Sequence, residues 1–116
     1  MSDVQESIDK LVKDNRVTLF MKGNRHFPQC GFSMRAVNIV GALGVPFETV
    51  DVLQDPAIRQ GIKEYSNWPT IPQLYIDGQF VGGSDILWEM YQSGDLHGLV
   101  TDHPKTAEST EAPAES

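Results

Sequence analysis

The stretch PQLYIDGQFVG, residues 72–82, decides which fold this sequence can adopt. Two short apolar runs flank Asp77-Gly78, and an Asp-Gly pair in that setting is the strongest short-range signal of a β-hairpin. A hairpin contributes an antiparallel pair of strands. The second half of the chain is therefore predicted to add antiparallel strands to the sheet that the first half builds.

The residues before this hairpin alternate between helical and extended patterns. Two runs rich in β-branched and aromatic residues, VTLFMK (17–22) and FETVDV (47–52), predict strands. Apolar residues at helical spacing between Cys30 and Gly44 predict the helix that connects them, which makes a βαβ unit with parallel strands. Two further helices are predicted, one from a Ser2–Gln5 capping box to about Asn15, and one capped by Asp55 and Pro56.

After the hairpin, Gly82-Gly83 leads into Ser84, which we expect to cap another helix. The predicted inner face of this helix consists of Ile86, Leu87, Met90 and Tyr91. A short last helix is predicted to turn Leu96, Leu99 and Val100 inward. A βαβ unit followed by a ββα unit predicts an α/β fold. Its core is a four-stranded mixed sheet flanked by helices on both faces.

Composition limits the classes of protein to consider. The chain has 116 residues and a formal net charge of −7, so one domain without a basic surface for nucleic acid is expected. Neither a membrane-spanning apolar run nor a secretory signal is evident, and a single unpaired cysteine suits a reducing compartment, so the predicted location is cytoplasmic. Residues 1–100 are predicted to form the domain, and 101–116 a disordered acidic tail that lacks large apolar residues.

The one cysteine, Cys30, lies where the loop after the first strand turns into a helix. Free amides at a helix N-terminus and the nearby Lys22 both favour a thiolate, so we expect a lowered pKa and a reactive thiol rather than an inert buried one. Ser33 occupies the position where a second cysteine would complete a dithiol. Cys30 can therefore attack an external disulfide or ligate a soft metal centre, and either role requires sulfur from outside the chain.

Three other features could meet this thiol. In WPTIPQ, 68–73, Pro72 is either a plain trans-proline at a strand start or a cis-proline that exposes the preceding backbone to an added peptide strand. The glycines and helix start of GGSD, 82–85, form either an anion site or an ordinary cap. Arg59 is a solvated surface charge unless its helix brings it to the same side of the molecule as the Cys30 thiol.

Taken together, FPQCGFS, the Arg59 helix and NWPTIPQLYIDGQFVGGSD resemble the monothiol glutaredoxins of the CGFS type, in particular the short, single-domain bacterial glutaredoxin 4 group. The similarity covers about residues 4–100. It implies a thioredoxin-like fold, a cis-Pro72 and a bound glutathione. The family often has cysteine where this chain has Ser84, which leaves Cys30 as the one protein sulfur.

The resemblance also implies a role for each matching residue. Cys30 would be both the catalytic thiol and the metal ligand. Glutathione would be held at its glycine carboxylate by Lys22 and Arg59, along its cysteinyl portion by the backbone of Ile71, and at its γ-glutamyl end by Ser84 and Asp85. Phe32, Thr70 and Pro72 would line the groove.

The function that follows from the resemblance is iron–sulfur cluster transfer. A 2Fe-2S cluster needs about four sulfur ligands, so two chains and two glutathiones would complete the set in a homodimer. The expected partners are apo iron–sulfur client proteins and a BolA-like protein. Two alternatives remain: a weak glutathione-dependent thiol–disulfide oxidoreductase, and a regulatory binding module that acts through its partner.

Overall fold

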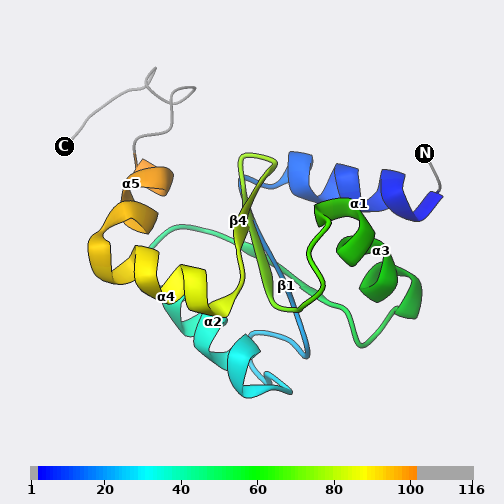
Figure 1. Cartoon of the computed structure of the whole chain (residues 1–116), viewed down its shortest axis with the longest axis horizontal. Coiled ribbons are helices and arrows are strands. Elements are labelled where there is room, and N and C mark those ends of the chain that lie inside the picture. The colour runs from blue at the N-terminus through cyan, green and yellow to red at the C-terminus, as the bar shows by residue number, and fades with distance from the viewer. Residues whose placement is uncertain (1–2, 102–116) are drawn as a thin grey trace.

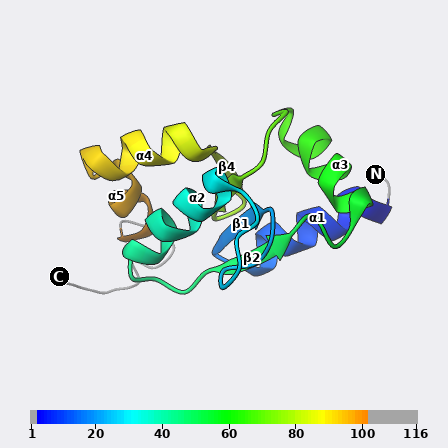
Figure 2. The same cartoon turned by 90° about the horizontal axis from the view of Figure 1, so that it is seen from below.

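The computed structural model describes residues 3–101, which form one mixed sheet between two layers of helices (Figures 1 and 2). The elements are, in order, α1 (Asp3–Asp14), β1 (Val17–Met21), α2 (Gly31–Ala42), β2 (Glu48–Asp51), α3 (Pro56–Ser66), β3 (Gln73–Ile76), β4 (Gln79–Gly82), α4 (Ser84–Ser93) and α5 (Asp95–Thr101). The strand order is β2-β1-β3-β4. The β1–β2 pair is parallel and the β3–β4 hairpin antiparallel, as predicted; the structure adds that β1 and β3 pair antiparallel at the centre of the sheet.

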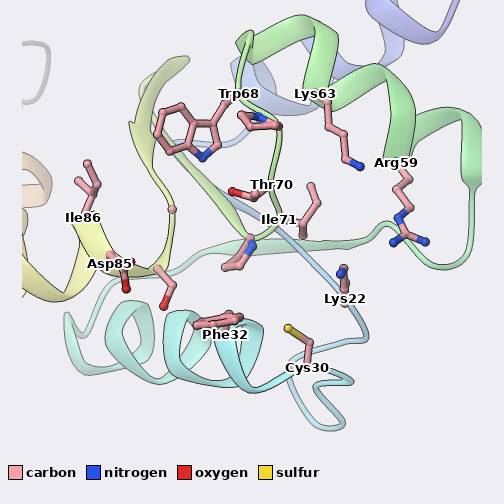
Figure 3. Close-up of a pocket in the computed structure, with 14 residues that line it drawn as sticks. Lys22, Cys30, Phe32, Arg59, Lys63, Trp68, Thr70, Ile71, Asp85 and Ile86 are labelled. Atoms are coloured by element: carbon pink, nitrogen blue, oxygen red, sulfur yellow. The ribbon is translucent and has the colours of Figure 1, made fainter.

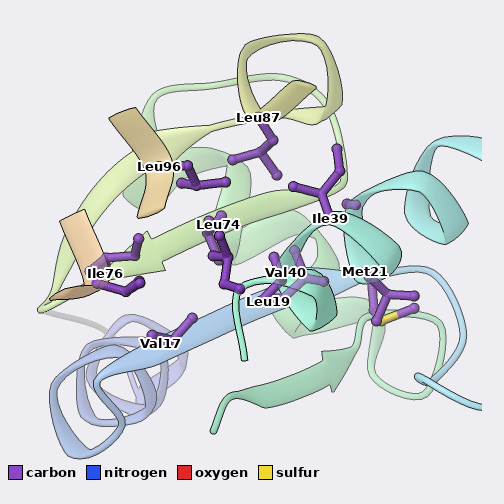
Figure 4. Close-up of a cluster of buried hydrophobic side chains, with 13 residues drawn as sticks. Val17, Leu19, Met21, Ile39, Val40, Leu74, Ile76, Leu87 and Leu96 are labelled. Atoms are coloured by element: carbon purple, nitrogen blue, oxygen red, sulfur yellow. The ribbon is translucent and has the colours of Figure 1, made fainter. Parts of the chain in front are cut away.

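The sheet separates two apolar cores, because successive side chains of a strand point to opposite faces. Leu19 and Met21 of β1 face the first core, which is filled from α2, α4 and α5 (Figure 4). Phe20 faces the second core, formed with α1 and α3. All five residues of β1 are buried, so this strand anchors both layers. Helices therefore cover both faces of the sheet, as the sequence predicts.

Local chemistry fixes the start of α3 and the turn between β3 and β4. The Asp55 carboxylate accepts hydrogen bonds from the amides of Ala57 and Ile58, and Pro56 opens α3 behind it. Asp77 and Gly78, which join β3 to β4, have φ angles of 55° and 79°, as a two-residue hairpin turn with both residues left-handed requires. Both predictions from the sequence are confirmed.

Three predicted details differ in the structure. Gly83, not Ser84, occupies the N-cap position of α4, and Ser84 is the first helical residue. Ile86 and Tyr91 are not on the inner face of α4, because their side chains are 41% and 39% exposed while Leu87 fills the core. Leu99 of α5 is likewise exposed at 42%. These helices bury a narrower stripe than their apolar content indicates.

Some predictions fall outside the described residues. The proposed Ser2 cap and the acidic tail beyond Thr101 lie there, so both stay predictions, as does the domain boundary at residue 100; Thr101 itself ends α5. Among residues 3–101, no helix is both long enough and apolar enough to cross a membrane.

Candidate functional site

A groove of about 440 Å³ opens where α2, α3 and the start of α4 meet the loop before β3 (Figure 3). The structure brings every predicted site residue to its wall: Lys22, Cys30, Phe32, Arg59, Thr70, Ile71, Pro72, Ser84 and Asp85. They come from both helical layers and from segments more than 60 residues apart in the sequence. The fold, rather than any local motif, therefore assembles the site.

Cys30 occupies the N-cap position of α2, with an extended backbone that places its thiol beside the free helical amides. Partial burial by itself would raise the pKa of the Cys30 thiol. The backbone amides of Ser33 and Phe32, the Ser33 hydroxyl and the charge of Lys22 act in the opposite direction and together lower the pKa below its ordinary value. The predicted lowering of the Cys30 pKa is found, and the thiol is half-buried rather than sealed in the core; its reactivity stays a prediction.

Ser33 is more than a missing second cysteine. Its side chain is fully buried, and its hydroxyl oxygen accepts a hydrogen bond of 3.0 Å from the backbone amide of Lys22. Because that oxygen is occupied as an acceptor, the hydroxyl proton is free to point at the Cys30 sulfur. Ser33 thus joins the end of β1 to the start of α2 and stabilises the thiolate between them.

The loop Trp68–Thr70 forms the upper wall, and Gln73 holds it from inside the protein. The buried Gln73 amide donates hydrogen bonds of 3.1 Å to the carbonyl oxygens of both Trp68 and Thr70. The Ile71–Pro72 peptide bond is cis, which settles the alternative left open by the sequence. No backbone partner for Ile71 occurs among residues 3–101, so its amide and carbonyl are free to pair with an extended ligand.

The two ends of the groove carry opposite charge. Lys22, Arg59 and Lys63 extend their cationic groups into one end, while Asp85 lies at the other (Figure 3). Next to Asp85, the Ser84 hydroxyl is buried and lacks a hydrogen-bond partner within the described residues 3–101. An unpaired buried hydroxyl beside a groove is suited to a polar ligand group. A zwitterionic or anionic peptide would lie along the groove in a single direction.

Comparison with known proteins agrees with this geometry. The family model described as Glutaredoxin matches residues 17–81, which is more than half of the chain. The chain belongs to the glutaredoxin family.

The relatives of this glutaredoxin place it among the monothiol members. It is 59% identical over 98 residues to an uncharacterized monothiol glutaredoxin ycf64-like of Synechocystis, an alignment covering 84% of this chain and 92% of that one. It is 45% identical over 115 residues to Glutaredoxin 4 of Escherichia coli K12, covering 99% and 100%. The solution structure of reduced poplar apo GrxS14 superimposes with a TM-score of 0.76 at 52% identity, covering 85% and 91%. The thioredoxin-like fold is therefore shown.

Five residues that line the groove of this glutaredoxin were not among the site residues predicted from the sequence. The remaining lining residues are Lys63, Trp68, Pro69, Gly83 and Ile86. Lys63 follows Arg59 by four residues, so helical spacing alone could have placed both on one face. Gly83 lies in the GGSD stretch singled out above, but the reason for a glycine there is a property of the assembled groove: a Cβ would stand 3.3 Å from the Pro72 carbonyl oxygen and 3.5 Å from the Trp68 indole nitrogen.

Proposed function

We propose that this chain is a glutathione-dependent iron–sulfur cluster carrier, which holds a 2Fe-2S cluster between two copies of itself and passes it to apo-proteins. The observation that carries the proposal is the position of Cys30. It is the one cysteine of the chain, its pKa is lowered, and it opens onto a groove shaped for a peptide. One such sulfur cannot satisfy a cluster that takes about four.

The groove could bind glutathione, whose thiolate would supply the cluster ligands that the chain itself lacks. A glutathione in it would place its glycine carboxylate near Lys22 and Arg59, its cysteinyl backbone along Ile71, and its γ-glutamyl end near Ser84 and Asp85. Its sulfur would then lie beside Cys30. Two chains and two glutathiones make four thiolates, of which two belong to exchangeable small molecules.

Transfer is then ligand exchange without redox change. Thiols of the receiving protein replace glutathione and Cys30 at iron; the protons that they give up pass to the departing glutathione thiolates and to solvent, while Cys30 leaves as a thiolate stabilised by its site. The exposed side chains of Phe32 and Met34, on the first turn of α2 beside Cys30, give this end of the molecule an apolar surface. We propose that a second copy of the chain, or a BolA-like partner, packs against this surface.

A second candidate function rests on the lowered pKa of Cys30. The thiolate would attack the glutathionyl sulfur of a mixed disulfide, releasing the substrate as a thiolate and leaving glutathione disulfide-bonded to Cys30. A second glutathione would then reduce that bond, forming glutathione disulfide. Such a reaction needs no second protein cysteine and no second copy of the chain.

Reconstitution with iron, sulfide and glutathione separates the two candidates. The carrier predicts a brown dimer by visible absorbance and by mass under native conditions. The oxidoreductase predicts a colourless monomer that reduces small glutathione mixed disulfides. Cys30→Ser must lose iron and sulfide while keeping its circular dichroism spectrum; retention of both would overturn the carrier mechanism.

A further inference from the structure

The cationic end of the groove carries more positive charge than one carboxylate needs. Lys22, Arg59 and Lys63 all line it. Across residues 3–101, none of the three forms an ion pair with a carboxylate. Lys22 is partly matched by the Cys30 thiolate, whose pKa it helps to lower. Arg59 and Lys63 then remain for the ligand.

The last turn of α3 favours a cation at Lys63, but two other features of this helix are unfavourable without an anion. Arg59 lies in the first turn after the Asp55 cap, where the partial positive charge of the helix end opposes a cation. Lys63 follows at i+4, so two like charges occupy neighbouring positions on one helix face. The neighbouring acids are engaged elsewhere: Asp55 accepts from helical amides, and Glu64 accepts a hydrogen bond of 3.2 Å from Gln60.

The whole chain makes this concentration of charge more significant, because its formal net charge is −7. A ligand with several negative charges is repelled by the net charge of the molecule and attracted by this end of the groove. Figure 3 shows Lys63 and Arg59 reaching from α3 toward the space above Lys22, on the side away from Asp85. An anionic group that enters there can contact both side chains of α3 at once.

We infer that this end of the groove is built for a dianionic group, and that the preferred ligand is a γ-glutamylcysteinyl tripeptide whose third residue carries a second carboxylate. This inference rests on the proposed glutathione groove and specifies its ligand class. The first carboxylate pairs with Arg59, as in glutathione, and the second with Lys63. Arg59 and Lys63 are thus the residues that set specificity at the third position of the ligand.

The test uses the full chain and S-methylated peptides, which cannot exchange disulfides with Cys30. The probes are S-methylglutathione, the same peptide with aspartate as its third residue, and the same peptide with glycinamide there. Isothermal titration calorimetry gives the three dissociation constants. We expect the aspartate peptide to bind about fivefold more tightly than S-methylglutathione, and the glycinamide peptide to bind more than tenfold more weakly.

Two comparisons attribute the preference to Lys63. In Lys63→Gln the ratio between the aspartate and glycine peptides should fall below twofold, whereas Lys10→Gln, which removes an equal charge from the exposed face of α1, should keep the wild-type ratio. In the wild-type chain the ratio should also shrink as salt rises, since the contacts are partly exposed.

Equal binding of the aspartate and glycine peptides by the wild-type chain would overturn the inference and leave the glutathione groove standing. A fivefold preference that survives Lys63→Gln would overturn the assignment to Lys63. Failure of S-methylglutathione itself to bind would overturn the proposed function as well.

Discussion

Replacing Arg59 with alanine should weaken glutathione binding without weakening the fold. The Arg59 side chain is exposed on α3, while Ile58 and Ile62 of the same helix are buried in the second core. No ion pair of Arg59 exists within residues 3–101, so its removal costs the folded chain little. Loss of the Arg59 side chain should therefore weaken ligand binding, and only when the ligand places a carboxylate in the groove.

The magnitude follows from the kind of bond that is lost. A hydrogen bond to a charged group contributes about 1.5–3 kcal/mol, and the exposure of Arg59 places it at the lower end of that range because water screens the pair. A loss of about 1.5 kcal/mol corresponds to roughly a tenfold change in binding constant. The Arg59→Ala protein should therefore need on the order of tenfold more glutathione to reach half-maximal cluster loading.

The assay is visible absorbance of the reconstituted protein against glutathione concentration, with thermal unfolding measured in parallel. Lys10→Ala serves as the control, because it removes one exposed positive charge far from the groove. Superimposable loading curves for wild type and Arg59→Ala would refute the reasoning, since Arg59 would then be an ordinary surface charge. A large drop in melting temperature would refute the claim that its role is confined to the ligand.

Three further outcomes are expected. Ser33→Ala should raise the pKa of Cys30, because the hydroxyl helps to lower it; the pH profile of alkylation by iodoacetamide should move to higher pH, and an unmoved profile would contradict the assignment. Gly61→Ala should lower the melting temperature by roughly 4 °C, a net loss of about 1 kcal/mol, since the added Cβ would collide with side chains of α1. Gly41→Ala, in open space on α2, should not lower the melting temperature. Equal melting temperatures for the two variants would be inconsistent with the contact between Gly61 and α1. Truncation after Thr101 should leave the melting temperature and cluster loading unchanged, and a drop in either would assign the tail a role.

The parts of the fold that could be predicted are those governed by local chemistry. The Asp55-Pro56 cap and the Asp77-Gly78 turn depend on groups within three residues of one another, and both are found as predicted. The α4 start was misplaced because Ser84 has the right residue type for a cap. In the folded chain Ser84 is the first helical residue and lines the groove, and its buried hydroxyl finds no hydrogen-bond partner within residues 3–101.

The predicted site residues meet in one groove, yet their residue-level prediction came from resemblance rather than from spacing. Nothing in the sequence around Gln73 indicates that its buried amide supports the Trp68–Thr70 wall. The exposure of Ile86 and Tyr91 could not be predicted either. Helical periodicity marks apolar positions but does not say which of them a neighbouring element will cover. Such contacts become visible only after the layers have packed.

The separation of the two cores by the sheet has a consequence for how a bound ligand acts on the whole molecule. Cys30 and Asp85 belong to helices that pack on the first core, whereas Arg59 and Lys63 belong to a helix that packs on the second. A peptide bound across the groove would therefore contact both helical layers, which otherwise meet through the shared sheet. Occupancy should slow amide hydrogen exchange on both faces of the sheet together, including in α1, which contributes no residue to the groove.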